Sequence, residues 1–376
     1  MNGPSQVDVV IVGGGITGAG LLHHLAPLDL SVLLLERGTL AIGATGRNAG
    51  FLIAGVASSY AAAVRVYGRA RGAEVWAFTR DTHEHLAEAI DGADTGYRRR
   101  GSLVAAYTTE EEADLEESLG LLREDGFRAE WSASGPLPGY LGGILSPDDA
   151  EVDSASAVRA LVAGAIARRG DRGGMEVREG IAVESFTATG GDVVVQTTDG
   201  LISAGALVLA TNAYTAALVA VPIAPVRGQM LVTAPALEVS LDRPVYSNHG
   251  FQYWRQLPDG RVTVGGWRDV DLVHEVGVDE SPTDVIQDHL DGHLRALGVR
   301  APVERRWAGT MGFTPDGLPL VGPLPGAPGV FLCGGYNGHG MGFALGCAAA
   351  VVNALGGGEP GIPGWADAAR FEPPDG

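Results

Sequence analysis

The sequence predicts an α/β fold in which a Rossmann-like nucleotide-binding domain is joined to a second, α+β domain that contains an antiparallel sheet. Three observations carry this prediction. The chain opens with a β-branched run and a glycine-rich turn at residues 7–18, a second buried apolar run occupies residues 207–212, and residues 222–267 alternate between apolar and polar side chains. The 376 residues are enough for two domains, or for one large domain with an insertion.

Residues 7–36 form a predicted β-α-β unit. The first strand covers residues 7–12, a helix begins at about Ile16 and ends near Pro27, and a second strand covers residues 31–35 and ends in Glu36. The turn between the first strand and the helix has the spacing G-x-G-x-x-G. An acidic residue about 20 positions beyond these glycines completes the arrangement that binds an ADP moiety.

Each residue of this motif has a physical role. Gly13 permits the tight turn, Gly15 lets the backbone approach a pyrophosphate, and Gly18 lets the helix lie close to the strand. Glu36 can accept hydrogen bonds from the ribose hydroxyls of adenosine, and its charge disfavours the 2′-phosphate of NADP. The motif therefore predicts a dinucleotide site at the start of the chain.

The middle of the chain alternates between predicted helices and strands. Apolar side chains at helical spacing predict helices within residues 57–92 and 153–169, and an acidic start predicts a solvated helix over residues 109–123. The proline-containing residues 136–147 are predicted to form a loop. Short β-branched runs predict strands at residues 97–107, 175–186, 192–197 and 207–212.

The C-terminal part of the chain contains a second glycine-rich turn. Residues 314–319 are rich in turn-forming residues, and residues 330–333 form a short predicted strand. The glycine-rich residues 334–342 then lead into a long helix, and such a turn presents free backbone N–H groups and the positive end of the helix dipole to a ligand. Residues 340–358 carry no charge, and their length and their Gly and Ala content predict a buried helix rather than a membrane span.

Composition excludes several kinds of partner and chemistry. All 26 basic residues are arginine, so neither a pyridoxal-phosphate Schiff base nor a P-loop lysine can be present. A net charge of −19 argues against nucleic acid or an anionic membrane surface as a partner. Cys333 and Cys347 are too few for a disulfide framework or a four-cysteine metal site. We therefore predict a cytoplasmic protein with no integral membrane segment and no bound metal.

Six blocks of sequence occur in the order found in a known family. They are residues 13–18 with Glu36 and Arg37, Gly-Ala-Thr-Gly-Arg-Asn-Ala-Gly at 43–50, Gly-Ile-Ala-Val at 180–183, Leu-Ala-Thr-Asn-Ala at 209–213, Pro-Val-Arg-Gly-Gln at 225–229, and residues 307–322 with Gly338-His339-Gly340-Met341. Through these blocks the chain resembles the FAD-dependent D-amino-acid oxidase superfamily, in particular its glycine oxidase and sarcosine oxidase branch.

The resemblance implies FAD rather than NAD, and an FAD-binding domain of the glutathione-reductase type that is discontinuous in sequence. It assigns residues 1–93, 149–221 and 307–376 to this domain. Residues 94–148 and 222–306 are then a substrate-binding domain, whose antiparallel sheet covers the flavin. The cofactor-binding residues that the resemblance implies are Gly13, Gly15, Ile16, Thr17, Gly18, Glu36, Arg37, Thr45, Gly46, Arg47, Asn48, Ala49, Val183, Ala210, Thr211, Asn212, Gly312, Gly338, His339, Gly340 and Met341.

The chain departs from the family at positions that bear on the substrate. Glycine-oxidase-like members have an arginine that binds the substrate carboxylate where this sequence has Met311, which cannot hold a carboxylate. The departure favours amines, N-substituted amines, or an amino acid whose carboxylate is held elsewhere, for instance by Arg47 or Arg255. Relatives with covalent flavin use a cysteine or a histidine near the places of Thr310, Met311 and Arg47, so we expect non-covalent FAD.

Four side chains form the predicted catalytic set. By the period of two in a strand, Tyr253 and Trp254 face opposite sides of one sheet, and we place Tyr253 towards the flavin. His339 contacts the flavin through its backbone or its imidazole. Arg47 either orients an anion or the flavin, or donates to loop carbonyls. Met311 lies where the resemblance implies contact with the substrate.

Two other patterns are predicted to be structural. His289 and His293 are four residues apart on a predicted helix, a spacing that is typical of metal ligands. Because no third ligand is evident, we expect a solvated helix face. Cys333 and Cys347 are expected to be small core residues.

The predicted reaction is oxidation of a C–N single bond. A neutral amine passes a hydride from its α-carbon to flavin N5, and the imine is hydrolysed in water. Two alternatives stay open, namely oxidation of a 2-hydroxy acid or polyol, and an FAD-carrying subunit that passes electrons within a larger complex. Sarcosine oxidases place a lysine near the flavin that helps oxygen react. This chain has none, so O2 and a quinone or other electron carrier are both candidate acceptors, and a homo-oligomer is compatible with the sequence.

Overall fold

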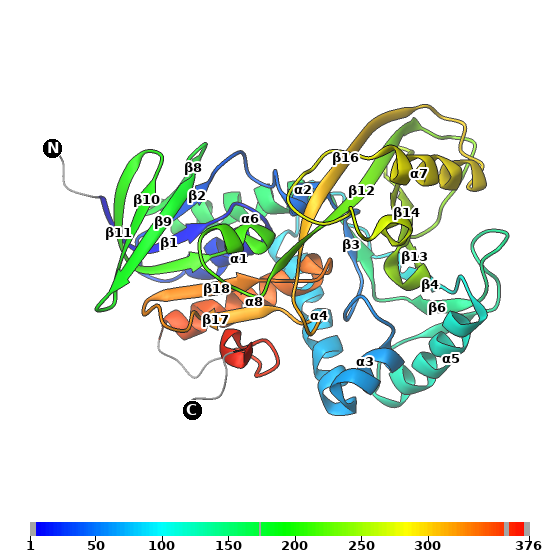
Figure 1. Cartoon of the computed structure of the whole chain (residues 1–376), viewed down its shortest axis with the longest axis horizontal. Helices are drawn as coiled ribbons and strands as arrows, with labels where there is room; N and C mark the ends of the chain where they lie inside the picture. The colour runs from blue at the N-terminus through cyan, green and yellow to red at the C-terminus, as the bar shows by residue number, and fades with distance from the viewer. Residues whose placement is uncertain (1–4, 173, 357–360, 372–376) are drawn as a thin grey trace.

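The computed structural model describes residues 5–172, 174–356 and 361–371. Within these residues the strands form two 8-stranded sheets and one 2-stranded sheet. The first large sheet contains the N-terminal strand and lies in the left half of Figure 1, and the second lies in the right half. Two long strands of the second sheet, β12 (Ala224–Pro235) and β16 (Val303–Phe313), extend to the middle of the molecule.

The first sheet has a parallel core in the order β17-β18-β11-β1-β2-β8, and its edge pair β17–β18 is antiparallel. Strand β10 pairs antiparallel with both β11 and β9. The strands are β1 (Ser5–Val12), β2 (Val32–Glu36), β8 (Met175–Glu179), β9 (Val183–Thr189), β10 (Asp192–Thr197), β11 (Gly200–Leu209), β17 (Leu320–Pro323) and β18 (Val330–Gly334).

The two faces of the first sheet pack against different elements, because successive side chains of a strand point to opposite faces. Val9 and Ile11 of β1 belong to a core cluster shared with helices, whereas Val10 and Val12 belong to a cluster shared with β10 and β11. The sheet is therefore buried on both faces, as its nearly continuous apolar strands require. The helices are α1 (Ile16–Leu25), α6 (Ser154–Arg169) and α8 (Gly340–Leu355).

The second sheet has the order β16-β12-β15-β14-β13-β4-β6-β5, and helix α7 (Asp284–Ala296) packs on it. Strand β16 pairs with β12 along most of its length, so the domain boundary predicted at residue 307 falls inside β16. The division into two domains stays a prediction. The other strands of the sheet are β4 (Ser102–Ala105), β5 (Glu130–Ser132), β6 (Gly143–Ser146), β13 (Val245–Ser247), β14 (Gln252–Gln256) and β15 (Arg261–Gly266).

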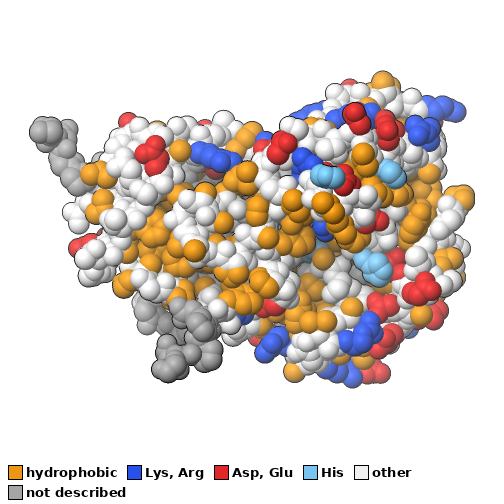
Figure 2. Space-filling view, in the orientation of Figure 1, with side chains coloured by type: hydrophobic (Ala, Val, Ile, Leu, Met, Phe, Trp, Pro, Cys, Tyr) orange, Lys and Arg blue, Asp and Glu red, His pale blue; other side chains and the backbone are white. Residues whose placement is uncertain are grey.

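Helices α3, α4 and α5 lie in the lower part of Figure 1, from its centre to its right side. Charged side chains gather over α3 and α5 in Figure 2, whereas hydrophobic ones are spread across the left half of that face. Arg65 of α3 pairs with Asp114 and Glu117 of α5. The bounds are α3 (Tyr60–Tyr67), α4 (Arg69–Ala89) and α5 (Thr109–Glu124); the short elements are α2 (Ala44–Arg47), β3 (Phe51–Leu52), β7 (Ala150–Glu151), η1 (Gly170–Arg172), η2 (Asn212–Ala217), η3 (Asn248–Gly250), η4 (Arg268–Asp271) and η5 (Ala368–Phe371).

Most predicted elements are present, with three differences. The prediction that residues 136–147 form a loop is wrong for residues 143–146, which form strand β6 and pair with β4 and β5. The single strand predicted at residues 175–186 is two strands, β8 and β9, because Gly180 has a φ of 75° and the chain turns there. The prediction that His293 lies on a solvated helix face is wrong: His293 is 3% exposed and its ring lies 4.5 Å from that of Trp254, although His289 is exposed. Among the described residues, no cluster of His, Cys, Asp and Glu side chains is arranged to hold a metal ion.

The uncharged C-terminal stretch is a helix over Gly340–Leu355, with residues 357 and 358 outside the described part of the chain. Cys333 and Cys347 are buried and unpaired, as the sequence predicts. Within the described ranges, no helix is both long enough and apolar enough to span a membrane.

Candidate functional site

A cavity of about 400 Å³ lies between the two sheets. Its wall comes from the glycine-rich turn before α1, from the end of β2, from the loop around α2, and from the turn before α8. The second sheet contributes side chains from β12, β13, β14 and β16. The cavity is thus lined by segments that are far apart in the sequence, and both glycine-rich turns predicted to bind a ligand open into it.

The turn before α1 is built for close approach of backbone groups. Gly13 has a φ of 110°, and a Cβ there would lie 2.7 Å from the carbonyl oxygen of Ala210. A Cβ on Gly18 would lie 2.0 Å from the carbonyl oxygen of Gly13, which explains why both positions must be glycine. The N-cap residue of α1 is Gly15, which has no side chain to cap the helix, and the backbone N–H of Ile16 donates to Thr45 Oγ1 at 3.1 Å. The positive end of this helix is therefore available to an anionic ligand.

Glu36 ends β2 beside this turn and is 8% exposed. Its Oε2 accepts a hydrogen bond from the backbone N–H of Gly14 at 2.7 Å, and its Oε1 accepts one from Gly38 at 2.8 Å. A carboxylate has about four acceptor positions, so two remain after these bonds. Glu36 lines the cavity, together with Val183 and Arg37, whose guanidinium lies 4.1 Å from the centre of the Tyr214 ring.

The loop around α2 is held in place by Arg47. The Nε of Arg47 donates to the carbonyl oxygen of Ile42 and its Nη1 to that of Ala308, both at 2.9 Å. The same guanidinium forms an ion pair with Glu280. These contacts favour the structural role for Arg47 over a role in binding a substrate anion, because its charge is paired and its Nε and Nη1 already donate.

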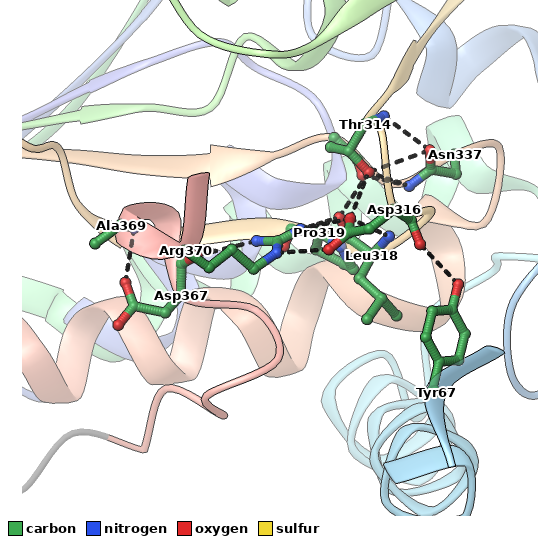
Figure 3. Close-up of polar contacts among 10 residues, drawn as sticks. Tyr67, Thr314, Asp316, Leu318, Pro319, Asn337, Asp367, Ala369 and Arg370 are labelled. Atoms are coloured by element: carbon green, nitrogen blue, oxygen red, sulfur yellow. Dashed lines mark hydrogen bonds and ion pairs between the residues drawn. The ribbon is translucent and has the colours of Figure 1, made fainter. Parts of the chain in front are cut away.

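The turn before α8 forms another part of the wall. Helix α8 has no side-chain cap, and its N-cap residue is His339. Asn337 holds the turn: its Oδ1 accepts from the backbone N–H of Thr314 at 2.9 Å and its Nδ2 donates to the carbonyl oxygen of Gly335 at 2.8 Å. Figure 3 shows how Asn337 and Thr314 connect to a larger polar cluster around Arg370.

Aromatic side chains of the second sheet face this turn across the cavity. Tyr253 lines the cavity while Trp254 is 1% exposed in the core of the second sheet, as the period of two predicts. The ring of Tyr253 is stacked 6.4 Å from that of Tyr246, its partner in the β13–β14 register, and lies 6.2 Å from that of Phe51. Tyr246 also meets the His339 ring edge-on at 5.8 Å.

Three titratable groups at this end of the cavity, Tyr253, Tyr246 and His339, are neutral at pH 7. Burial raises the pKa of Tyr253 to about 12 and raises that of Tyr246 further. Burial lowers the pKa of His339 to about 4, which makes its imidazole neutral and only weakly basic. The tyrosines can therefore donate hydrogen bonds, but none of these three groups is an effective base.

Comparison with known proteins identifies the family. A model described as "FAD dependent oxidoreductase" matches residues 8–354. The chain belongs to this family. It is 27% identical to 4-methylaminobutanoate oxidase (formaldehyde-forming) of Paenarthrobacter nicotinovorans and to mitochondrial sarcosine dehydrogenase of Mus musculus, over 98% and 95% of this chain but only 46% and 40% of theirs. The chain thus spans less than half the length of these two relatives.

Other matches cover both partners almost completely. Glycine oxidase of Pseudomonas putida is 27% identical over 94% of this chain and 95% of its own length. The crystal structure of glycine oxidase from Geobacillus kaustophilus superposes with a TM-score of 0.82 and covers 98% of this chain and 100% of its own, at 23% identity. L-proline dehydrogenase from P. horikoshii superposes with a TM-score of 0.79 over 98% of both chains, at 22% identity. These superpositions confirm the predicted fold class.

The residues of the cavity fit FAD, the cofactor of this family. Helices α1 and α8 both begin at this cavity, and neither N-cap residue makes a side-chain cap bond, which suits a diphosphate and an electron-rich ring system. Glu36 keeps acceptor positions for ribose hydroxyls. A Cβ at Gly15 would lie 3.0 Å from the hydroxyl of Thr45, which shows how tightly the turn and the loop around α2 meet.

Most of the predicted site residues line the cavity. Three glycines predicted to bind the cofactor do not line it: a Cβ on Gly46 would lie 2.2 Å from the carbonyl oxygen of Ala41, one on Gly312 would lie 2.6 Å from Asn212 Oδ1, and Gly18 faces Gly13. These glycines allow close packing behind the wall. The predicted residues that line it are Gly13, Gly15, Ile16, Thr17, Glu36, Arg37, Thr45, Arg47, Asn48, Ala49, Val183, Ala210, Thr211, Asn212, Tyr253, Met311, Gly338, His339, Gly340 and Met341.

Arg255 does not lie where the sequence suggested, and Arg268 lines the cavity although the sequence did not point to it. Arg255, suggested as a carboxylate holder, is 6% exposed, pairs with Glu151 and is not a lining residue. Arg268 and Tyr246 do line the cavity and were not predicted. The rule that placed Tyr253 could have found Tyr246, since the two face each other in register. Arg268 follows a strand in a short 3₁₀ helix, where no periodic signal marks its direction.

Proposed function

We propose that this chain oxidises the C–N bond of an amine, an N-substituted amine or an amino acid. The observation that supports the proposal is that one cavity joins a dinucleotide-binding turn to the start of α8 and to the wall formed by Tyr246, Tyr253 and Phe51. FAD held by these residues would supply the oxidising chemistry, namely removal of a hydride from the carbon beside the nitrogen to give an imine that water hydrolyses. The chain itself supplies binding, orientation and a dry site.

The positive end of α8 has an electrostatic role in this proposal. Its first backbone N–H groups lack a side-chain partner and face the cavity wall, so they would stabilise negative charge that develops on a cofactor held there. Asn337 and Thr314 fix the turn so that these donors need not reorganise. The three rings of the wall exclude water above the reacting carbon, which strengthens each electrostatic interaction there.

Proton handling falls to the substrate rather than to a side chain. Tyr253 stays protonated because burial raises its pKa to about 12, and His339 is a weak base because burial lowers its pKa to about 4. The amine must therefore bind in its deprotonated form. We expect kcat/KM to rise with pH along the titration of the substrate amine.

Several finer points belong to the proposal. Relatives named for amine or amino-acid oxidation match nearly the whole chain, and they include a sarcosine dehydrogenase and a glycine oxidase. We propose non-covalent FAD, because the positions implied for covalent attachment hold Thr310, Met311 and Arg47. The electron acceptor, whether O2 or a quinone-type carrier, and a cytoplasmic location stay predictions.

The test is anaerobic reduction of the purified holoenzyme by matched substrate pairs. Each primary amine, N-methylamine and amino acid is compared with the hydroxy compound of the same skeleton, for example phenylglycine with mandelate. We expect a yellow protein whose flavin absorbance is bleached by nitrogen compounds and not by their hydroxy partners. A colourless protein that takes up no FAD would overturn the proposal, and bleaching by hydroxy acids alone would favour the 2-hydroxy-acid alternative.

A further inference from the structure

Arg268 is a cation in the wall of the cavity, at the start of η4. It follows Trp267, whose φ of 60° turns the chain sharply after β15. Its guanidinium lies 4.9 Å from the centre of the Phe251 ring and 5.3 Å from that of Phe313. The two rings hold the guanidinium beside the cavity through cation–π contacts and keep water from part of it.

The guanidinium of Arg268 has no hydrogen-bond acceptor and no carboxylate within 4.0 Å among the described residues. Two acids act on it electrostatically, and each has one carboxylate oxygen bonded elsewhere and one buried oxygen with no hydrogen-bond partner among the described residues. Glu275 accepts from Arg227 at 2.7 Å in a buried ion pair, and Asp269 Oδ2 accepts from Asn248 at 2.9 Å. Arg47 and Arg227, which also touch this part of the fold, both have carboxylate partners.

An unpaired guanidinium in a partly buried wall is unfavourable by itself. Burial is the main reason that the pKa of Arg268 is lowered. Buried charges in native proteins are normally paired or hydrogen-bonded, because desolvation of an isolated ion costs several kcal/mol. An arginine whose planar set of donors remains free at a cavity is therefore suited to an anionic ligand, and to a carboxylate in particular, which it can bind through two parallel bonds.

Two further donors lie near this cation. The hydroxyl groups of Tyr246 and Tyr253 make no hydrogen bond within the described part of the chain, and both phenols interact electrostatically with Arg268. Because both phenols stay protonated at neutral pH, they can donate to an anion. The guanidinium provides only donors, and each phenol adds one more donor, which favours a ligand group that accepts several hydrogen bonds.

We propose that Arg268, assisted by the hydroxyl groups of Tyr246 and Tyr253, binds the carboxylate of an amino acid or N-substituted amino acid in this cavity. The inference rests on the proposed function and narrows its substrate to amines that carry a carboxylate. It also changes what Met311 implies about the substrate. The cation that binds the carboxylate comes from the segment after β15, so the apolar Met311 on β16 does not exclude a carboxylate. Arg268 is then a specificity-determining residue.

The experiment uses two probes of nearly identical shape, phenylacetate and phenylacetamide, and measures their binding to the holoenzyme by calorimetry and by the visible spectrum of the flavin. We expect phenylacetate to bind at least tenfold more tightly than the amide. Arg268→Met should remove this preference, a loss of about 1.4 kcal/mol or more, and leave the affinity for the amide unchanged. Arg268→Lys keeps a point charge without the planar donors, and its affinity for phenylacetate should fall between the other two.

The matched control is Arg305→Met. Arg305 is exposed, lies 5.2 Å from the centre of the Trp307 ring and does not line the cavity, so its loss removes an arginine and a cation–π contact of the same kind. We expect both affinities to be unchanged in this variant. Wild-type protein that binds both probes equally, or neither, would overturn the proposal, and so would Arg268→Met that keeps the preference for phenylacetate.

The readout separates this inference from the proposed function. Binding that depends on Arg268 in a protein that oxidises no amine would contradict the proposed function and leave the carboxylate site standing. Amine oxidation with an unchanged KM for amino acids in Arg268→Met and Arg268→Lys would contradict the carboxylate site alone. If Arg268→Met does not fold, the comparison of Arg268→Lys with wild type carries the same test.

Discussion

Two arginines of this chain, Arg370 and Arg268, lie in similar local structure but differ in their hydrogen-bond partners. Arg370 and Arg268 both lie in short 3₁₀ helices, and each guanidinium lies over a phenylalanine ring, at 4.7 Å from the centre of Phe371 and 4.9 Å from that of Phe251. Arg370 donates to both carboxylate oxygens of Asp316, at 2.8 and 2.9 Å, and to the carbonyl oxygens of Leu318, Pro319 and Asp367 (Figure 3). Arg268 donates to no described residue.

The contrast separates an arginine that holds the fold from one that is available to a ligand. The cluster of Arg370 fixes the turn at residues 314–319, and Tyr67 adds a hydrogen bond from its hydroxyl to the carbonyl oxygen of Asp316 at 2.8 Å. Through Thr314 and Asn337 the same cluster supports the start of α8. Stability and binding are thus assigned to different arginines, and the unfolding free energy should tell them apart. All measurements below are urea titrations with saturating FAD, because cofactor binding itself stabilises the folded state.

The largest loss of stability is expected for Arg370→Met. The substitution leaves Asp316 without its cation and the carbonyl oxygen of Pro319 without its side-chain donor. Hydrogen bonds to charged groups contribute about 1.5–3 kcal/mol each without adding in full. We expect the unfolding free energy to fall by about 2–4 kcal/mol. Arg305→Met is the control and should change it by less than about 0.5 kcal/mol. Equal effects for the two variants would show that the network in Figure 3 carries no stability.

A second prediction concerns His83, a buried group that has no partner and does not line the main cavity. It is 2% exposed, and neither ring nitrogen has a hydrogen-bond partner in the described structure. Burial lowers its pKa to about 3, so between pH 6.5 and 3 the unfolded chain binds a proton that the folded chain does not. Stability from this group is therefore complete above pH 6.5 and is lost as the pH falls.

The measurement compares the unfolding free energy at pH 7 and pH 5 in wild type, His83→Leu and His85→Leu. Removing His83 should reduce the loss between these pH values by about 2 kcal/mol, at about 1.4 kcal/mol for each pH unit below 6.5. His85 is exposed on the same helix, so its variant should keep the wild-type pH dependence. If His83→Leu also keeps the wild-type pH dependence, burial of a titratable group without a partner has no measurable cost in this fold. The unpaired Arg268 would then give less reason to expect a ligand.

The sequence predicted which residues of the first glycine-rich turn line the cavity better than which residues of the second sheet do. Gly13, Gly15 and Glu36 act through local geometry, because a tight turn, a helix start and the end of the next strand all lie within one β-α-β unit. Their spacing alone is informative. The prediction that Tyr253 and Trp254 face opposite sides is confirmed for a local reason, since alternation along a strand decides which face a side chain takes, whereas a catalytic role for Tyr253 stays a prediction.

The failures have a common physical origin. The choice between Arg47, Arg255 and Arg268 depends on which acids the fold brings beside each guanidinium, and these acids come from distant segments: Glu280 for Arg47 and Glu151 for Arg255. The sequence shows the charges but not their pairing. His293 was misplaced for a related reason, because a polar residue on an amphipathic helix was counted as solvated while the fold stacks it on Trp254.

The smallest effect, and the sharpest test of the comparison, is expected for Arg268→Met. The variant loses two cation–π contacts of about 0.5–1 kcal/mol each but no longer holds an unpaired cation in a partly buried wall, and the methionine can still pack on both rings. We expect the unfolding free energy to change by less than about 1 kcal/mol in either direction. Phenylacetate at a hundred times its dissociation constant should stabilise the wild type by about 2.7 kcal/mol and this variant far less. A fall as large as that of Arg370→Met would mean that Arg268 has a structural partner, and the two arginines would then not differ in kind.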